Sequence, residues 1–378
     1  MFLKRIRLEN LLSFQNAELI FEPLTVLIGP NGSGKSNLLD VIGLLQALPD
    51  SFSRAVLAGG GGPQWMNKAA DVSDASIAAE LFSEDQGLRY LLRFEGSHST
   101  PIVLKEQLSD TASVPHVYFE RAMKSVLFDS GNGSGTRKGD ASPSESFFSQ
   151  FRAPGDPTPI SSVGRQLASI QIYRDLSTSQ SSDVRRGAPT SGPKRPLEPT
   201  GSNLALSINE FDFLGLLPEL NRLLKDLDPG FESVKVRLEA STAQIYLQES
   251  GLSERIPALR MSDGTLRFLQ LAVILLDPQP GSIVCIDEPE TGLHPDSLRV
   301  LAKMLREACA HTQVIVTTHS STLVDQFADE PESIVVVERE PRSGSSFKRL
   351  NRRDLEKWMD DYTLGDLWQR GFLGGNQY

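Results

Sequence analysis

GPNGSGKS, at residues 29–36, matches the pattern G-x-x-x-x-G-K-[ST] of a phosphate-binding loop. An apolar run at Leu24–Ile28 precedes it, and helical apolar spacing over Asn37–Leu48 follows it. Glycines in such a loop let backbone N–H groups face phosphate oxygens, and the N-terminus of the following helix adds positive partial charge. Average residue frequencies predict about 0.01 chance matches in a chain of this length. The stretch therefore predicts a strand, a phosphate loop and a helix, rather than a glycine-rich turn that only caps a helix.

The same loop predicts which residues would hold a nucleoside triphosphate. Lys35 would bridge the β- and γ-phosphates, and the Ser36 hydroxyl would bind Mg²⁺. A guanine-specific Asn-Lys-x-Asp is absent, because Asn67-Lys68 is followed by aspartate at the wrong spacing, so elimination favours ATP. The nucleotide-binding residues expected here are Gly29, Pro30, Asn31, Gly32, Ser33, Gly34, Lys35, Ser36 and Asn37.

A second apolar run, Ser282–Ile286, ends in the two acids Asp287 and Glu288. Such a run is typical of a parallel strand covered on both faces, and ligands bind at the carboxyl ends of these strands. We expect Asp287 to hold Mg²⁺, directly or through water, and Glu288 to polarise the water that attacks the γ-phosphate. The alternative is an ordinary exit from a strand into a turn.

A third apolar run, Val314–Thr317, is followed closely by His319. A helix over Pro295–Ala310 separates it from the acidic strand, so the two strands are expected to be parallel neighbours with both exits over one phosphate. His319 is then a γ-phosphate sensor, and a structural histidine at a strand end is the alternative. His294 has no such strand before it and is either a loop residue near a subunit interface or structural.

Met261–Thr265 is a short polar loop that opens a strongly apolar helix over Leu266–Leu276. The Ser262 hydroxyl and the N–H groups around Gly264 would form a second anion site at this helix N-terminus. A capped helix without any ligand is the alternative.

In their order along the chain these motifs resemble those of the ATP-binding-cassette (ABC) ATPases, in particular the SMC/RecF-like branch. Within that branch, CIDEPE at 285–290 with GLHP at 292–295 is similar to prokaryotic AAA-type ATPases related to the OLD family, as are LGDLW at 364–368 and LGG at 373–375. The resemblance implies an α/β fold, namely a P-loop NTPase head of the ABC type with a mixed sheet, an antiparallel β meander and an inserted helical or loop lobe.

The resemblance also implies that two heads dimerise head-to-tail with ATP between them. Ser262 and Gly264 of one protomer would then meet the γ-phosphate held by Lys35 of the other. The Ser-Gly-Gly core usual in these ATPases is Ser-Asp-Gly here, so Asp263 brings a negative charge near a phosphate. Gln64 is a candidate for the Q-loop glutamine.

Composition divides the chain into a head and a lobe. Residues 129–203 are rich in Ser, Gly, Pro and Thr, which predicts long loops or partial disorder. We expect a single head formed by 1–120 and 230–378, with 121–229 as a partly flexible inserted lobe. The other patterned segments are strands at Ser76–Phe82, Leu88–Phe94 and Ile102–Leu104, a helical stretch at Ile208–Leu227, and a hairpin of Val234–Glu239 with Gln244–Gln248.

Composition also excludes several classes of protein. The net charge of −10 argues against a protein that coats nucleic acid. The longest apolar stretch is far short of the roughly 20 residues that span a bilayer. The N-terminus lacks a secretory apolar region, so we expect a cytoplasmic protein without a membrane partner. Cys285 and Cys309 make neither a disulfide framework nor a zinc cluster.

The leading hypothesis is an ATP-hydrolysing switch that forms a head-to-tail homodimer around ATP and drives a DNA-associated or defence partner. Possible partners are DNA and a separate effector protein, in DNA repair or phage defence. An ATP-bound scaffold with little turnover and the motor subunit of a membrane transporter are the alternatives. The residues after Val324 are too few for a Toprim nuclease domain, so we expect the ATPase alone. Other candidate contacts are Phe14 with adenine, unless it belongs to the core, and Arg185, Arg186, Lys194, Arg195, Lys348, Arg349, Arg352 and Arg353 with nucleic acid.

Overall fold

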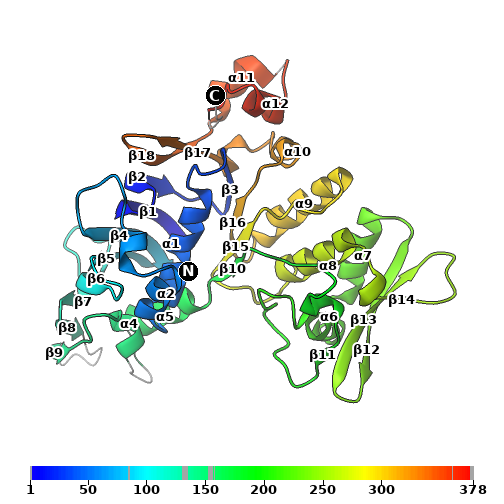
Figure 1. The fold of residues 1–378 in the computed structure, drawn as a ribbon, viewed down its shortest axis with the longest axis horizontal. Coiled ribbons are helices and arrows are strands. Elements are labelled where there is room, and N and C mark those ends of the chain that lie inside the picture. The colour runs from blue at the N-terminus through cyan, green and yellow to red at the C-terminus, as the bar shows by residue number, and fades with distance from the viewer. Residues whose placement is uncertain are drawn as a thin grey trace.

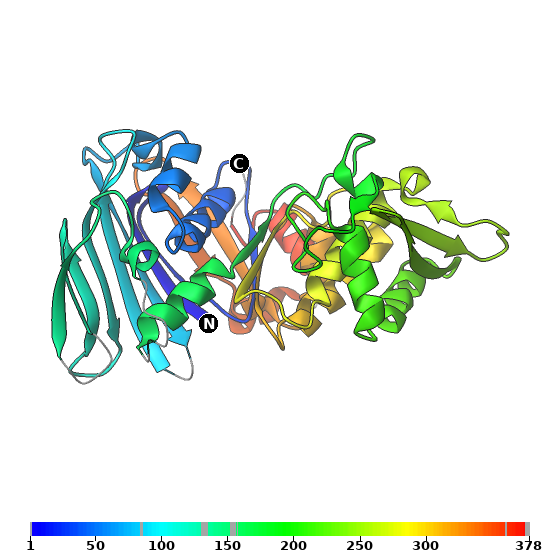
Figure 2. The ribbon, with the colours of Figure 1, turned by 90° about the horizontal axis from the view of Figure 1, so that it is seen from below.

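A computed structural model describes residues 2–83, 86–129, 135–151, 156, 158–359 and 361–374. The chain forms a broad, sheet-based part and a smaller lobe, with two helices, α8 and α9, between the sheet and the lobe (Figures 1 and 2). The helices of the chain are α1 (Lys35–Ala47), α2 (Phe52–Ala58), α3 (Gly62–Trp65), α4 (Phe147–Gln150), α5 (Pro159–Ala168), α6 (Leu204–Phe213), α7 (Leu217–Leu227), α8 (Asp263–Leu275), α9 (Leu298–Ala308), α10 (Ser321–Asp325), α11 (Arg352–Met359) and α12 (Leu364–Gln369), with short 3₁₀ helices η1 (Asp183–Arg185), η2 (Ala258–Arg260), η3 (Pro295–Ser297) and η4 (Pro331–Ser333).

The broad part is built on one 14-stranded mixed sheet, in the order β10-β15-β16-β3-β17-β18-β2-β1-β4-β5-β6-β7-β8-β9. Its strands are β1 (Phe2–Leu11), β2 (Phe14–Ile20), β3 (Leu24–Ile28), β4 (Asp74–Ser83), β5 (Gln86–Glu95), β6 (Ile102–Asp110), β7 (Val117–Ala122), β8 (Ser125–Asp129), β9 (Thr136–Asp140), β10 (Gln171–Tyr173), β15 (Ile283–Asp287), β16 (Gln313–Thr317), β17 (Ile334–Glu340) and β18 (Gly344–Arg349). From β10 to β17 the neighbouring strands are parallel, and from β17 to β9 they are antiparallel. The predicted mixed sheet with an antiparallel meander is confirmed.

The parallel strands are apolar because they are covered on both faces. All five residues of β3 and of β16 are buried, and alternate side chains of these strands enter two separate hydrophobic cores. Helices α8 and α9 contribute to one core, and helix α1 contributes to the other. Cys285, in the middle of β15, is a fully buried core residue, as its position in an apolar run suggests.

The prediction of long loops or partial disorder over 129–203 agrees with residues 174–203, where the described elements are only η1 and β11, but it is wrong for much of the part up to Tyr173. Strand β9 extends the meander, helix α5 buries Ile160, Val163 and Leu167, and β10 pairs with β15 at the sheet edge. The expected head boundary at residue 120 lies inside β7. Residues 130–134, 152–155 and 157 of this segment lie outside the described residues.

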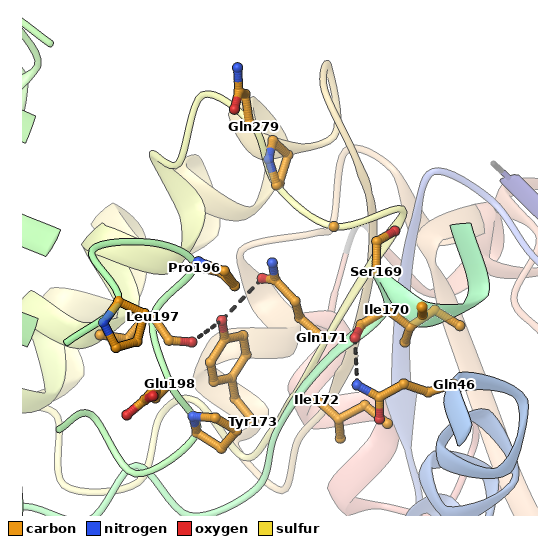
Figure 3. Close-up of a pocket in the computed structure, with 15 residues that line it drawn as sticks. Gln46, Ser169, Ile170, Gln171, Ile172, Tyr173, Pro196, Leu197, Glu198 and Gln279 are labelled. Carbon is orange, nitrogen blue, oxygen red and sulfur yellow. Dashed lines mark hydrogen bonds between the residues drawn. The ribbon is translucent and has the colours of Figure 1, made fainter. Parts of the chain in front are cut away.

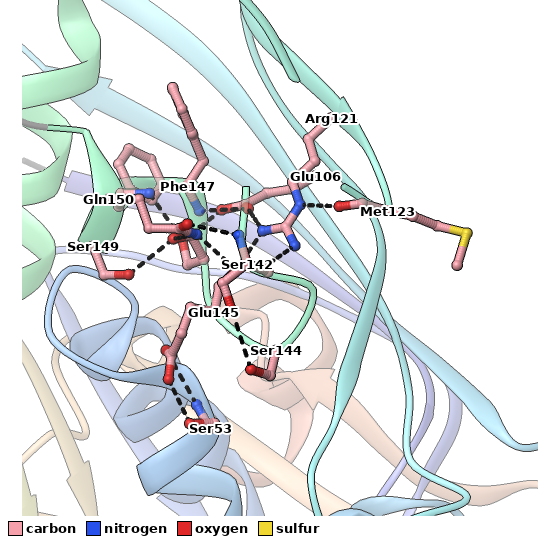
Figure 4. A network of polar contacts seen from close by, with 12 residues as sticks. Ser53, Glu106, Arg121, Met123, Ser142, Ser144, Glu145, Phe147, Ser149 and Gln150 are labelled. Atoms are coloured by element: carbon pink, nitrogen blue, oxygen red, sulfur yellow. Dashed lines mark hydrogen bonds and ion pairs between the residues drawn. The ribbon is translucent and has the colours of Figure 1, made fainter. Parts of the chain in front are cut away.

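A buried polar network explains why the serine-rich stretch 142–150 is ordered (Figure 4). The side chains of Glu106 and Arg121 are fully buried and form an ion pair of 3.6 Å. Glu106 accepts hydrogen bonds from the Ser146 hydroxyl (2.6 Å) and the Phe147 N–H (2.8 Å). The Arg121 guanidinium donates to the carbonyls of Ser142 and Glu145. These charges are remote in sequence from the stretch they hold, so local composition does not predict its order.

The smaller lobe contains α6, α7 and a second sheet. Its strands are β11 (Ala188–Pro189), β12 (Phe231–Glu239), β13 (Thr242–Glu249) and β14 (Ile256–Pro257), and β12 and β13 form the predicted hairpin. A cavity of about 550 Å³ lies where the lobe meets the sheet edge (Figure 3). There the Tyr173 hydroxyl of β10 donates to the Leu197 carbonyl (2.9 Å), and the Gln46 amide donates to the Ile170 carbonyl (2.6 Å).

Candidate functional site

The phosphate loop joins β3 to α1, as the motif predicts. Gly34 precedes helix α1 and offers no side-chain cap, so the first N–H groups of this 13-residue helix remain free for another acceptor. Gly29 has φ 148°, and a Cβ at this position would stand 2.3 Å from the Val337 carbonyl oxygen. A glycine is therefore required where the loop leaves the strand. Uncapped N–H groups at a helix N-terminus suit the phosphates of a nucleotide.

Lys35 lies folded onto this loop. Its side-chain ammonium donates to the carbonyls of Gly29 (2.8 Å) and Pro30 (3.1 Å). Burial lowers the pKa of Lys35, while the negative charges of nearby Glu288, Asp287 and Glu290 oppose this shift. The lysine and the carboxylates thus belong to one site.

The exit of β15 carries both predicted acids, beside the exit of its parallel neighbour β16. Asp287 pairs in register with Thr317, whose hydroxyl donates to the Asp287 carboxylate. The Glu288 N–H lies 3.1 Å from both the hydroxyl and the carbonyl oxygen of Thr317. Glu288 has φ 47°, a left-handed conformation that is uncommon for a residue with a side chain and that clusters at functional sites.

His319 lies beside Glu288, because β16 is the parallel neighbour of β15 as the sequence predicts. Its Nε2 atom is 3.6 Å from Glu288 Oε1. Glu290, to which the sequence motifs assign no role, accepts from the Thr318 hydroxyl (2.6 Å) and the His319 N–H (2.9 Å) and so fixes this loop. Burial lowers the pKa of His319, and the positive charge of Lys35 lowers it further.

The oxygen atoms at this site have the chemistry that Mg²⁺ prefers. The Ser36 hydroxyl and the Asp287 carboxylate are hard ligands of the kind found in P-loop proteins. Within the ranges that the structure describes, no cluster of three or more His, Cys, Asp or Glu could hold a metal. A magnesium ion here would therefore take most of its remaining ligands from phosphate and water.

The loop at Ser262 forms a capped helix terminus, which was the alternative to an anion site. The Ser262 hydroxyl oxygen accepts from the Thr265 N–H (3.0 Å) at the start of α8. A Cβ on Gly264 would stand 3.0 Å from the Gly292 carbonyl, so this loop abuts the GLHP segment. Helices α8 and α1 pack into opposite cores of the sheet. Within one chain, the Ser262 hydroxyl thus serves as the N-cap of α8.

Two arginines that the sequence motifs did not predict also contact the site. Arg267 of α8 is buried and donates to the Glu288 carbonyl (2.9 Å) and the Leu176 carbonyl (3.2 Å). Arg339 of β17 reaches the Gly32 carbonyl (3.5 Å). A charge inside a strongly apolar helix is the signal that would have identified Arg267, because a buried arginine needs partners.

The secondary candidates have different outcomes. Phe14 is fully buried and stacks on Phe347 with ring centroids 5.3 Å apart, so it belongs to the core. His294 is exposed and accepts from the Asp296 N–H (3.3 Å). Gln64 lines a pocket of about 380 Å³ beside the phosphate loop, together with Asn37.

Several of the candidate nucleic-acid contacts are already engaged within the chain. Arg185 is buried against Asp263, and Arg195 forms an ion pair of 2.7 Å with buried Asp277. Lys194 pairs with Glu210 (2.9 Å). Arg185 is therefore too buried to be a surface contact, and the Arg195 guanidinium is partly buried against Asp277. Nucleic-acid binding by the other residues of this cluster stays a prediction. Of the second cluster, Lys348, Arg352 and Arg353 are exposed, and Arg349 donates to the carbonyls of Glu332 and Ile20.

The fold and the site together define the class of the protein. A phosphate loop after a central parallel strand, acids at the exit of β15 and a histidine at the exit of β16 are the parts of a P-loop NTPase head of the ABC type. Two families agree with this assignment. Residues 1–93 match a family described as "AAA ATPase domain", and residues 144–325 match one described as "AAA domain, putative AbiEii toxin, Type IV TA system". The fold and the motifs of the chain are those of an ABC/SMC-like ATPase head.

Curated relatives share a short segment with this chain. ABC transporter A family member 4 of Arabidopsis thaliana is 37% identical over 83 residues, which cover 22% of this chain and 8% of the relative. Family member 2 of the same plant is 35% identical over 107 residues, which cover 28% of this chain and 10% of the relative. The chain thus spans only about a tenth or less of the length of these curated relatives.

Solved structures extend the likeness to the whole fold. The Smc head bound to the C-winged helix domain of ScpA has a TM-score of 0.56 at 15% identity, over 94% of this chain and 99% of that one. The Pyrococcus furiosus Smc head with an extended coiled coil, bound to the C-terminal domain of ScpA, has a TM-score of 0.53 at 15% identity, over 95% and 99%. At these identities the likeness establishes the fold. No helix in the described part of the chain has the length and hydropathy of a membrane span.

Proposed function

We propose that the protein is an ATP-driven switch in which two heads close around bound ATP and separate after hydrolysis. The observation that carries this proposal is the convergence of Lys35, Glu288 and His319 at the ends of neighbouring parallel strands. A triphosphate on the phosphate loop would place its γ-phosphate among these three side chains. The arrangement suits hydrolysis, because a base, a cation and a hydrogen-bond donor face one reacting group.

Each side chain has a distinct role in this mechanism. Lys35 moves from the loop carbonyls to the β- and γ-phosphate oxygens. The Glu288 carboxylate orients the attacking water and accepts its proton. His319 donates a hydrogen bond to the γ-phosphate. Ser36 and Asp287 would hold Mg²⁺, which neutralises phosphate charge when bound.

The second half of the site comes from a partner copy in this proposal. Ser262 and the N–H groups around Gly264 lie at the N-terminus of α8. Helix α8 packs on one face of the sheet, and α1 packs on the other. Anions are stabilised at such a terminus. Placed against the γ-phosphate of another protomer, this loop makes closure depend on intact ATP.

The switch is proposed to act on another macromolecule. The Smc heads that share this fold were solved with ScpA bound, and one matching family is described by a toxin of a Type IV system. We therefore include in the proposal a separate effector protein, or DNA, that responds to closure, and a relation to the OLD-type ATPases of DNA repair and phage defence.

Dilution provides a direct test of this function. Because each complete site would need two protomers, the rate of Mg²⁺-dependent ATP hydrolysis per protomer should rise with protein concentration and then level off. Phosphate release is measured over a range of concentrations that spans the transition. GTP and ATP are compared at each concentration. A rate per protomer that stays constant on dilution, with full activity in a monomer of verified mass, would contradict shared sites.

The position of His319 predicts the acidic limb of the pH profile. Since burial and Lys35 lower its pKa, protonation should require a pH below the usual value of about 6.5. Protonated His319 would pair with Glu288, which lies 3.6 Å away, and weaken it as a base. The ratio kcat/KM should therefore hold steady as the pH falls to about 6.5 and decline only below it.

The matched variant His319→Gln keeps a hydrogen-bond donor but does not titrate. Its kcat/KM should be lower throughout, and its acidic limb should be displaced from that of the natural protein. The measurement covers about pH 5 to 8, where an imidazole changes charge. Coincident limbs in the two proteins would remove His319 from the profile.

A further inference from the structure

Arg185, at the end of the short helix η1, reaches into the loop that precedes α8. Its side chain is only 2% exposed. The Nη1 atom lies 3.1 Å from the Ala258 carbonyl and 2.8 Å from the Met261 carbonyl, and Nη2 donates to Asp263 Oδ1 at 2.5 Å. Nε donates to the Thr178 carbonyl (2.7 Å). A single guanidinium thus joins its own segment to both ends of the turn around Ser262.

These contacts are what a buried arginine needs in order to be stable. A guanidinium presents its donors in a rigid fork, and charged hydrogen bonds are stronger than neutral ones. Removing such a charge from water is costly unless carbonyls and a counter-ion surround it. The carbonyls of Ala258 and Met261 and the carboxylate of Asp263 are these partners. The burial of Arg185 is therefore tied to the conformation of the loop.

The charge of Asp263 gives this contact a functional meaning. Asp263 lies between Ser262 and Gly264, and its side chain is 66% exposed. An uncompensated carboxylate would repel a γ-phosphate that approaches the N-terminus of α8. Arg185 supplies one positive charge to that carboxylate at hydrogen-bonding distance. The pair leaves the N–H groups of the helix terminus as the main electrostatic feature of the loop.

We propose that Arg185 is a positioning residue for ATP-dependent closure: it holds the Ser262 loop in shape and masks the charge of Asp263 from the partner's γ-phosphate. This inference rests on the proposed function, because it concerns the surface that would meet ATP across the dimer. It also explains how Ser-Asp-Gly serves where Ser-Gly-Gly is usual, since the extra negative charge comes with its own cation. The cation belongs to the segment between β10 and α6, so the lobe contacts the loop directly.

A double-mutant cycle in Glu288→Gln protein tests this inference. Arg185→Met should weaken ATP-dependent dimerisation by about tenfold or more, because Asp263 is then unmasked. Asp263→Gly should change the dissociation constant by less than about threefold, since the charge it removes is already masked. The combination should dimerise more tightly than Arg185→Met alone, since no carboxylate is left to repel the phosphate, and the loss that remains reports the loop-holding contacts of Arg185. Dimer mass is measured by light scattering against protein concentration at saturating ATP and Mg²⁺.

The controls separate positioning from stability. Arg186→Met alters the exposed neighbour of Arg185 and should leave the dissociation constant unchanged. Thermal unfolding is recorded for every variant. If Arg185→Met does not fold, Arg185→Lys keeps the charge without the fork, and a smaller weakening that Asp263→Gly relieves is then expected.

Each remaining result has one meaning. If folded Arg185→Met dimerises like the reference, or if Asp263→Gly fails to rescue it, the inference is overturned while the proposed function stands. If the reference protein shows no ATP-dependent dimer, or if Ser262→Arg leaves that dimer intact, the proposed function fails and takes the inference with it.

Discussion

Glu288→Gln protein is expected to double its mass when ATP and Mg²⁺ are added, and a further Ser262→Arg change is expected to abolish the doubling. Glutamine keeps the shape of Glu288 but cannot accept the proton of the attacking water, so hydrolysis should fall by about 10²-fold or more. Blocked hydrolysis accumulates the closed state. Arginine at position 262 would fill the space that a phosphate must enter. Mass in solution, with and without nucleotide, is the measurement.

A matched acid on the surface provides the control. Glu307 of α9 is half exposed and forms a long ion pair of 3.7 Å with Lys303, so Glu307→Gln should leave both mass and hydrolysis unchanged. The mechanism would be contradicted if the Glu288→Gln protein had the same mass with and without ATP and Mg²⁺, whether or not it also carried Ser262→Arg. A dimer that persists without nucleotide would instead indicate a constitutive oligomer, and stable assembly with slow turnover would favour the scaffold alternative.

Two inactive variants are expected to recover activity when they are mixed. Lys35→Met should abolish phosphate binding on its own loop, and Ser262→Arg should block the loop offered to a partner. Alone, each should lose about 10²-fold or more of the ATPase rate, since an electrostatic contact to the transferring group is missing. In a mixed dimer, Lys35 of one protomer and Ser262 of the other form one intact site. Random mixing should restore about a quarter of the natural rate, because half of the dimers are mixed and each has one working site.

This experiment distinguishes sites shared between protomers from sites completed within one chain. If Lys35 and Ser262 acted in the same protomer, mixing would restore nothing, and the head-to-tail geometry would be excluded. The control is a mixture of Lys35→Met with Glu288→Gln. Those residues lie in one chain's site, so each mixed dimer would lack an intact set and the mixture should stay inactive.

The candidate site was largely predictable because its parts are encoded locally. The phosphate loop is recognisable from its eight consecutive residues, even though the fold requires glycine at Gly29 partly because the Val337 carbonyl of β17 lies against it. The acids and the histidine follow apolar runs that become adjacent parallel strands, so one topological rule brings Glu288 to His319. Site residues that are placed by such short motifs can be identified from one sequence.

The order of the serine-rich segment could not be predicted in the same way. Its composition indicates loops, yet Glu106 and Arg121 of the meander anchor residues 142–150 through a fully buried ion pair. No residue pattern near Ser146 predicts that Glu106 and Arg121 will be its partners. Burial energy from a distant sheet outweighed the weak propensity of the segment.

The sequence by itself therefore determined the nucleotide loop, the acidic strand exit and the class of fold, because each depends on residues that are neighbours in the chain or in successive strands. Only the tertiary structure decided which charges are exposed. In the sequence, Arg185 looks like one of a run of surface cations. The fold instead buries it against Asp263, which lies 78 positions further along the chain. The physical reason is that a buried charge must find its partner in space, and a partner at that separation is specified by packing rather than by any local pattern.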